Sequence, residues 1–310
     1  MNKINLIIGT GILGAYLAFE LLKNKEKVIV TSRFKKNNYK NFEFLKIQKR
    51  IKFLKLDIKN KNEIEKIIDK YDPSKIYYFA GQSSLTKSQK LKNETFDSHF
   101  TGTKNFLDIL KKKRSTCKFF KANSGYIFNP KNGKIDLNCD FSNNKNVYIQ
   151  AQKKTFKLIN RYKKFKLNLF NLVFLQIESP LRPNDFFIKK VCVGAKNKKI
   201  INIGNINTFR DYSWITEIVK SIFLTSKMKS NNFIISAGKK LSGKEILNTA
   251  FKLNNLDYRK YIKINKKLFR KNEKKFLIGS SMNTKYLKNK FNFKFKISGK
   301  KLVKQMYKSL

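Results

Sequence analysis

The stretch VYIQAQKK, residues 147–154, places a tyrosine, a glutamine and a lysine where one helix could bring them to a reactive site. A tyrosine hydroxyl can serve as an acid or base, but a free tyrosine titrates near pH ~10 and is a poor base at neutral pH. The position four residues after Tyr148, on the same helix face, is Gln152, which carries no charge. Lys153 lies about 100° further round an ideal helix. The pattern indicates a candidate acid–base site on one helix face, formed by a tyrosine and a neutral amide, with the nearest cation one step round the helix.

A strand–turn–helix–strand unit precedes these residues and could hold a dinucleotide. KINLII (3–8) reads as a buried strand, GTGILG follows it, and AYLAFELLKNK has apolar residues at helical spacing before the strand VIVTSR (28–33). Gly9, Gly11 and Gly14 would let the backbone approach a pyrophosphate at the helix N-terminus. In this context the glycine pattern predicts dinucleotide binding.

The end of the second predicted strand bears on the choice between NAD and NADP. The sequence there is Thr31-Ser32-Arg33, followed by Lys35 and Lys36. Hydroxyls and cations suit a 2′-phosphate, whereas NAD binders usually place an acid at this point. We therefore expect NADP rather than NAD, although most short stretches of this chain contain basic residues.

Alternating strands and helices continue the pattern. IKFLKLDI (51–58) reads as a strand ending in Asp57, which is placed to meet an adenine amino group. KNEIEKIIDKY (61–71) and TGTKNFLDILKKK (101–113) read as helices, and KIYYFAGQSS (75–84) as a strand entering a small-residue loop. CKFFKANSGYIF (117–128) would deliver Ser124 to the carboxyl end of a strand, where doubly wound sheets bind ligands. We predict an α/β fold of the Rossmann type with a doubly wound parallel sheet.

The composition bears on whether the protein could instead bind nucleic acid. The chain has 310 residues and is 41% hydrophobic, and its 70 Lys and Arg against 20 Asp and Glu give a net charge of +50. We interpret this charge as compositional, because the lysines are scattered and no nucleic-acid-binding motif organises them. Specific nucleic-acid binding stays an alternative that would need salt-resistant, sequence-selective binding.

The cysteines and the apolar runs limit other classes of function. Cys117, Cys139 and Cys192 have no paired spacing, which fits free thiols in a reducing, cytoplasmic compartment and predicts no metal site. No apolar run reaches the roughly 20 residues needed to span a bilayer, so no membrane association is expected.

Several longer segments resemble one family in the same order along the chain. NLVFLQIESPLRPNDFFIKKV (171–191), IGNINTFRDYSW (203–214) and LFRKNEKKFLIGSSMNTKYLKNKFNF (268–293) are the most specific. With the glycine turn, FKANSGYIF and VYIQAQ, they make the chain similar to the extended short-chain dehydrogenase/reductases that act on nucleotide sugars. Within that group it resembles the GDP-mannose 4,6-dehydratase family.

The resemblance implies roles for residues at several strand ends. Those implied to bind cofactor are Gly9, Gly11, Gly14, Ser32, Arg33, Asp57, Ile58, Ala80, Gly81, Gln82, Tyr148 and Gln152, with Gly9 displaced from the family's first glycine. Those implied to bind substrate are Ser83, Ser124, Gln176, Glu178, Lys190, Arg210, Arg270 and Glu273. The catalytic positions are Ser124, Tyr126, Tyr148, Gln152 and Lys153.

The catalytic positions depart from the family pattern. Gln152 replaces a lysine that lowers the tyrosine pKa, and Tyr126 replaces a glutamate that acts as base at the sugar C5. His99 occupies an Asn or Asp position, and we interpret it as a packed or surface histidine rather than a catalytic one. We expect an NADP-dependent enzyme that acts on a nucleotide sugar, GDP-linked by resemblance. The alternatives are a reductase or epimerase of a 4-keto sugar nucleotide, and a catalytically impaired binding protein.

The expected domain organisation follows from the same segments. Residues 1–170 should form the NADP-binding domain, with strands near 171–176 and 231–238 returning to its sheet. Residues 177–310 should mainly form a smaller nucleotide-sugar-binding region. By resemblance, a homodimer or homotetramer is expected.

Overall fold

The computed structural model describes residues 3–34, 39–269 and 273–310. These residues divide into two compact units, each assembled from separate stretches of chain. The first unit comprises residues up to 128, 140–174 and 219–233, and the second comprises 129–139, 175–218 and 234–310.

A sheet with strand order β11-β7-β5-β4-β1-β2-β3 forms the centre of the first unit. Its strands are β1 (Ile4–Ile8), β2 (Lys27–Ser32), β3 (Lys52–Lys55), β4 (Lys75–Tyr78), β5 (Lys118–Ser124), β7 (Asn168–Phe174) and β11 (Asn232–Ile235). The pairings from β3 across to β7 are parallel. The chain order reverses between β1 and β4, which is the switch point where doubly wound sheets bind ligands. The predicted Rossmann-type fold is confirmed.

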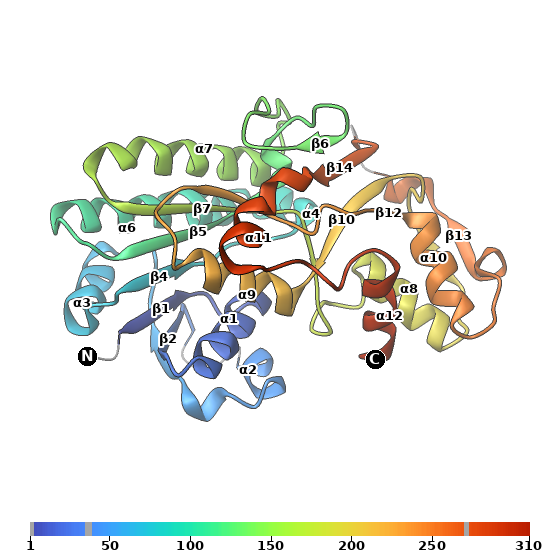
Figure 1. The fold of residues 1–310 in the computed structure, drawn as a ribbon, viewed down its shortest axis with the longest axis horizontal. Coiled ribbons are helices and arrows are strands. Elements are labelled where there is room, and N and C mark those ends of the chain that lie inside the picture. The colour runs from blue at the N-terminus through green and yellow to red at the C-terminus, as the bar shows by residue number, and fades with distance from the viewer. Residues whose placement is uncertain (1–2, 35–38, 270–272) are drawn as a thin grey trace. The chain divides into compact units, whose positions relative to one another are not determined.

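Helices cover both faces of this sheet. They are α1 (Ile12–Lys23), α2 (Lys40–Phe44), α3 (Lys61–Tyr71), α4 (Leu85–Lys90), α5 (Lys92–Phe96), α6 (Gly102–Lys112), α7 (Val147–Tyr162) and the later α9 (Ile215–Thr225). Apolar side chains of α3, α6 and α7 share one buried cluster with the strands, including Ile64, Phe106 and Ile159. Figure 1 shows α6 and α7 on one side of the sheet and α1 on the other.

Local sequence explains where these elements begin. Asn60 precedes α3 and its side chain accepts hydrogen bonds from the backbone N–H groups of Asn62 and Glu63, which satisfies donors that the helix leaves free. Asn146 caps α7 in the same way by accepting from the N–H of Tyr148. The cap sets the first turn of α7 and therefore the position of that tyrosine.

The second unit contains a smaller mixed sheet with helices packed together beside it. Its strands are β6 (Lys134–Ile135), β8 (Gln176–Glu178), β10 (Phe209–Trp214), β12 (Lys240–Ser242) and β14 (Phe276–Gly279), with a separate pair β9 (Ile201–Ile203) and β13 (Ile262–Ile264). The helices are α8 (Phe187–Lys196), α10 (Gly243–Lys252), α11 (Lys285–Phe291) and α12 (Lys300–Lys308). Apolar residues of α8, α10 and α12 form the core of this unit with those of β9 and β10.

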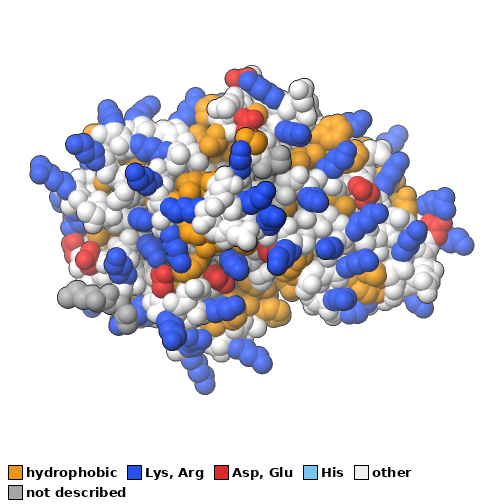
Figure 2. Space-filling model, in the orientation of Figure 1, with side chains coloured by type: hydrophobic (Ala, Val, Ile, Leu, Met, Phe, Trp, Pro, Cys, Tyr) orange, Lys and Arg blue, Asp and Glu red, His pale blue; other side chains and the backbone are white. Residues whose placement is uncertain are grey.

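Lysine and arginine side chains dominate the face of the molecule seen in Figure 2, and acidic side chains are sparse there. The basic side chains are distributed over many elements on this face rather than gathered on one of them. Within the described ranges, no helix combines the length and apolar character needed to cross a bilayer.

Candidate active site

The turn between β1 and α1 is shaped to accept a phosphate group. Gly9 has a φ of +115°, and a Cβ on it would lie 3.0 Å from the backbone nitrogen of Ala80. Gly14 lies so close to the turn that a Cβ there would be 2.4 Å from the carbonyl oxygen of Gly9. A Cβ on Gly11, in contrast, would meet no atom of the described residues within 4 Å. The open space beside Gly11 at the N-terminus of α1 fits a dinucleotide pyrophosphate.

The end of β2 carries an ion pair that the sequence did not predict. A guanidinium nitrogen of Arg33 lies 2.5 Å from a carboxylate oxygen of Glu94, and both side chains are about half exposed, at 49% and 45%. Ser32 accepts a hydrogen bond from the backbone N–H of Phe34. Lys35 and Lys36 lie outside the described residues.

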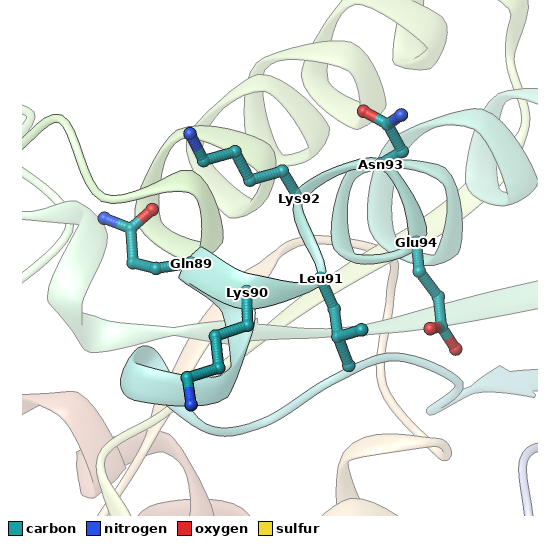
Figure 3. A pocket seen from close by; sticks show the side chains of 6 residues that line it. All are labelled: Gln89, Lys90, Leu91, Lys92, Asn93 and Glu94. Atoms are coloured by element: carbon teal, nitrogen blue, oxygen red, sulfur yellow. The ribbon is translucent and has the colours of Figure 1, made fainter.

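Glu94 belongs to α5, beside a shallow surface pocket at the junction of α4 and α5. Figure 3 shows the residues that line it, Gln89–Glu94, with the carboxylate of Glu94 pointing away from Asn93. Tyr148, Gln152 and Ser124 do not line this pocket. We therefore place the reactive centre elsewhere in the first unit.

After β3, two of the residues expected to bind cofactor have local roles. The carboxylate of Asp57 accepts a hydrogen bond from the N–H of Lys59, at 2.9 Å. Ile58 is buried in the cluster shared with α3 and α6, and its carbonyl accepts from the side chain of Asn105. Both follow β3, which ends at Lys55 rather than at Asp57 as the sequence pattern predicted.

The loop after β4 lies between the glycine turn that follows β1 and a buried histidine, His99. Gly81 has a φ of +139°, and a Cβ on it would lie 2.3 Å from Cε1 of His99. The carbonyl of Gln82 lies 2.9 Å from Nε2 of His99. The side chain of Gln82 accepts from the N–H of Ser84, which in turn caps α4. The loop Ala80–Ser83 is thus held between Gly9 and His99.

Tyr148 and Gln152 both meet this histidine from the first turns of α7. The rings of His99 and Tyr148 are 5.4 Å apart in an edge-to-face arrangement. The amide nitrogen of Gln152 lies 3.4 Å from Nδ1 of His99, and only 3% of Gln152 is exposed. Oε1 of Gln152 is buried and has no hydrogen-bond partner among the described residues. Sequence reasoning interpreted His99 as a packed or surface residue, and the structure shows that it is packed and lies at the centre of this cluster.

The other catalytic candidates lie in the same unit as this cluster. Ser124 ends β5, is nearly buried, and accepts a hydrogen bond from the N–H of Tyr126. Lys153 donates instead to the carbonyl of Ser142, at 3.1 Å, because α7 is regular and turns this side chain away from Gln152.

Burial keeps His99 neutral. Loss of hydration, the larger cause, and the nearby charge of Lys121 together lower the pKa of His99 to about 3, against the opposing effect of the Gln82 carbonyl. The carbonyl can only accept, so the ring proton sits on Nε2 and Nδ1 is left as an acceptor for the amide of Gln152. The imidazole therefore acts as a fixed hydrogen-bonding group rather than as a titrating one.

Lys121 is a second residue that the sequence did not single out. It lies on β5 with 1% of its surface exposed, donates to the carbonyl of Ala122 and places its ammonium 5.2 Å from the ring centroid of Tyr78. Burial lowers the pKa of Lys121 to about 7. Among 70 basic residues, no sequence signal distinguished this lysine from a solvated one.

The residues expected to bind substrate lie mostly in the second unit. Arg210 is nearly buried and pairs with Glu273 at 3.0 Å, so two of them contact each other. Burial raises the pKa of Glu178, on β8, to about 7 against the opposing charges of Arg182 and Lys189. Gln176 is also on β8 and Lys190 on α8. Arg270 lies outside the described residues.

Comparison with known proteins identifies the family. A family model described as GDP-mannose 4,6 dehydratase matches residues 6–306. The GDP-mannose 4,6 dehydratase of Dictyostelium discoideum is 23% identical over 344 residues, which cover 98% of this chain and 95% of the relative. That of Drosophila melanogaster is 25% identical over 273 residues, covering 81% and 68%.

Solved structures support the fold. A dTDP-glucose 4,6-dehydratase from Bacillus anthracis, in complex with NAD, has a TM-score of 0.81 at 17% identity, covering 99% of this chain and 96% of its own. A Thermus thermophilus UDP-glucose 4-epimerase, also with NAD, has a TM-score of 0.82 at 15% identity and covers 99% of both chains. The match along nearly the whole sequence shows that the chain belongs to the GDP-mannose 4,6 dehydratase family, a family of enzymes.

Proposed function

We propose that this protein binds NADP and a GDP-linked sugar and transfers a hydride at C4 of the sugar, as the first step of a 4,6-dehydration. The supporting observation is a continuous set of contacts from the glycine turn to the tyrosine. Gly9 abuts Ala80, Gly81 abuts His99, and His99 meets the ring of Tyr148. A dinucleotide bound at α1 would therefore reach the elements that hold Tyr148.

The described residues fit the cofactor at two points. Space for a pyrophosphate lies beside Gly11, and the orphaned Oε1 of Gln152 is an acceptor that a ribose hydroxyl can satisfy. When bound, the dinucleotide supplies the acceptor and later the donor of the hydride. The half-exposed Arg33 is the residue through which we propose a preference for NADP over NAD.

Side chains of the protein would accept the proton of the sugar 4-hydroxyl and align its oxygen. The phenolate form of Tyr148 would take the proton of the sugar 4-hydroxyl and become the phenol, and the hydroxyl of Ser124 would align the same oxygen. Gln152 holds no charge that could stabilise a phenolate. We therefore expect slow turnover compared with a site that has a lysine at this position.

A second candidate function follows from Tyr126. Dehydration needs a base at C5, and the residue two positions after Ser124 is a tyrosine rather than a carboxylate. Without that base, the reaction that remains is hydride transfer itself. The chain would then reduce a 4-keto sugar nucleotide and consume one reduced dinucleotide for each product.

Incubation of the purified protein with GDP-mannose and NADP, followed by mass spectrometry, tests the proposal. Dehydration gives a product lighter by one water, with no net change in NADP. We expect Tyr148→Phe to lower the rate at least about 100-fold, while Tyr162→Phe, at the far end of α7, leaves it unchanged.

The alternatives give different results in the same assay. Stoichiometric oxidation of NADPH with a GDP-4-keto sugar, and no loss of water from GDP-mannose, would favour the reductase. Calorimetric binding of NADP and GDP-mannose without any product from either substrate would contradict an enzymatic function and leave a binding protein.

A further inference from the structure

His99 is held by three elements of the first unit and has little freedom to move. It lies in a π-helical turn, Asp97–Thr101, between α5 and α6. Its backbone carbonyl lies 2.6 Å from the hydroxyl of Thr103 on α6 and 3.1 Å from that of Thr155 on α7. On the other side, the missing side chain of Gly81 makes room for the imidazole. The histidine is 4% exposed.

The same packing fixes which nitrogen of His99 can face Gln152. Nε2 points at the Gln82 carbonyl and must donate to it, so Nδ1 presents a lone pair to the Gln152 amide. Ionisable groups near His99 include Lys121 from β5, Tyr78 from β4 and Tyr148 from α7, and the turn itself carries Asp97, which accepts from the hydroxyl of Thr101. A cationic neighbour and deep burial both oppose protonation of the ring.

A fixed Nδ1 acceptor also fixes the amide of Gln152. With the NH₂ group directed at His99, Oε1 must face the other way, and it has no partner among the described residues. Solvent does not reach Oε1, so only a group that enters the cluster can supply the missing donor. An amide oxygen accepts hydrogen bonds only, which excludes a phosphate or a carboxylate and favours a hydroxyl.

We propose that His99 is a positioning residue that orients Gln152, so that Oε1 of Gln152 binds a hydroxyl of the ribose next to the nicotinamide. This inference rests on the proposed binding of a dinucleotide. It assigns to the chain's single histidine a role that acts through Gln152 rather than on the reacting atoms. A neutral imidazole and a neutral amide together replace a charged side chain in holding this ribose.

Calorimetry with ADP-ribose and with ADP separates this contact from the rest of the cofactor site, because ADP lacks the second ribose. We expect Gln152→Met and His99→Phe each to weaken ADP-ribose binding about five- to tenfold, while ADP binding stays within about twofold. Lys157→Met, on the exposed face of α7, serves as the control. His99→Asn, which can still accept from the amide, should recover most of the affinity.

The double variant His99→Phe/Gln152→Met tests whether one residue acts through the other. If His99 acts only by orienting Gln152, the double variant binds ADP-ribose no more weakly than Gln152→Met alone. Additive losses, or unchanged ADP-ribose binding in Gln152→Met, would overturn the inference. If wild type bound ADP and ADP-ribose equally, the ribose contact would be refuted while nucleotide binding stood. Failure to bind either ligand would refute the proposed function as well.

A measurement on the unaltered protein covers the case in which His99→Phe does not fold. Because the chain has one histidine, long-range ¹⁵N NMR reports on His99 alone. We expect the proton on Nε2 from pH 5 to pH 8, and a shift of the Nδ1 signal on adding ADP-ribose but not ADP. A proton on Nδ1, or equal shifts with both ligands, would contradict the proposal.

Discussion

The guanidinium of Arg33 and the carboxylate of Glu94 form an ion pair of 2.5 Å between the end of β2 and α5. The carboxylate of Glu94 therefore contacts the same guanidinium that we propose binds the 2′-phosphate of NADP. Both side chains are about half exposed, so their interaction is weak and a phosphate can compete with it. Glu94 should therefore influence the choice between NAD and NADP.

Glu94→Gln should raise the affinity for NADP about two- to fivefold and leave that for NAD unchanged, because it removes a competitor for Arg33. Isothermal titration with both dinucleotides measures the effect. Glu65→Gln makes the same change of net charge on α3, where Glu65 pairs with Lys112. An equal gain in that control, or equal gains for NAD and NADP, would mean that total charge rather than this pair is responsible.

Substitution by alanine should weaken ligand binding at Gly11 but lower the stability of the fold at Gly14. The backbone of Gly11 suits any residue and a Cβ there meets open space, so Gly11→Ala should fold with nearly normal stability but bind ADP at least about tenfold more weakly. Gly14→Ala would force a methyl group against the Gly9 carbonyl and should lower the unfolding midpoint. Thermal unfolding and ADP titration of both variants test this. Unimpaired ADP binding by Gly11→Ala would show that the pyrophosphate lies elsewhere.

Lys121 should make stability depend on pH in a defined window. Its pKa is about 7 in the folded protein and 10.5 in an unperturbed lysine, so the folded state binds fewer protons between these values. Above pH 10.5 the lysine is neutral in both states and its burial does not lower the free energy of unfolding. As the pH falls from 10.5 to 7 the unfolded state takes up the proton first, so this stability is progressively lost and is gone once the pH has fallen through 7. The difference in free energy of unfolding is on the order of 5 kcal/mol.

Lys121→Met should unfold at a higher urea concentration than wild type at pH 7, with much less advantage at pH 9.5. Lys23→Met, an exposed position at the end of α1, controls for the loss of one positive charge. Parallel pH profiles for wild type and Lys121→Met would contradict the lowered pKa of Lys121.

Gln152→Lys tests whether the tyrosine lacks only a cation. An ammonium four residues after Tyr148 should stabilise its phenolate and move the rise of the pH–rate profile to lower pH. The same substitution buries a charge beside His99 and should lower the thermal midpoint. Gln152→Met, neutral and of similar length, is the matched comparison. Equal rates for the lysine and methionine variants at neutral pH would place the limitation elsewhere, with Tyr126 the next residue to change.

Short-range sequence patterns were sufficient for the nucleotide-binding half of the fold. The helix expected at 61–71 begins and ends at those residues, since Asn60 caps it and a buried apolar face continues through Ile68. Ser124 stands at the carboxyl end of β5 as its strand pattern indicated. These features depend on neighbours within a few residues, which a single sequence displays.

Features that depend on distant packing were not visible in the sequence. His99 and Gln152 are 53 residues apart, and their contact requires a π-helical turn that no local pattern marked. The two-residue strand β6 exists because it pairs with β14, more than 140 residues later. Lys121 is unusual only because β5 buries it. In each case the environment, rather than the residue type, determines the chemistry.

The interleaving of the two units bears on how the protein is made. The strand β11, at the edge of the larger sheet, is synthesised after a long stretch that belongs to the second unit. A ribosome-bound chain that has already exposed Tyr148 and Gln152 must therefore wait about 80 residues for the last strand, several seconds at ordinary rates of translation. From the completion of β7 at Phe174 to the start of β11 at Asn232, β7 presents an unpaired edge. Chaperone binding to nascent chains should accordingly peak between the emergence of β7 and that of β11.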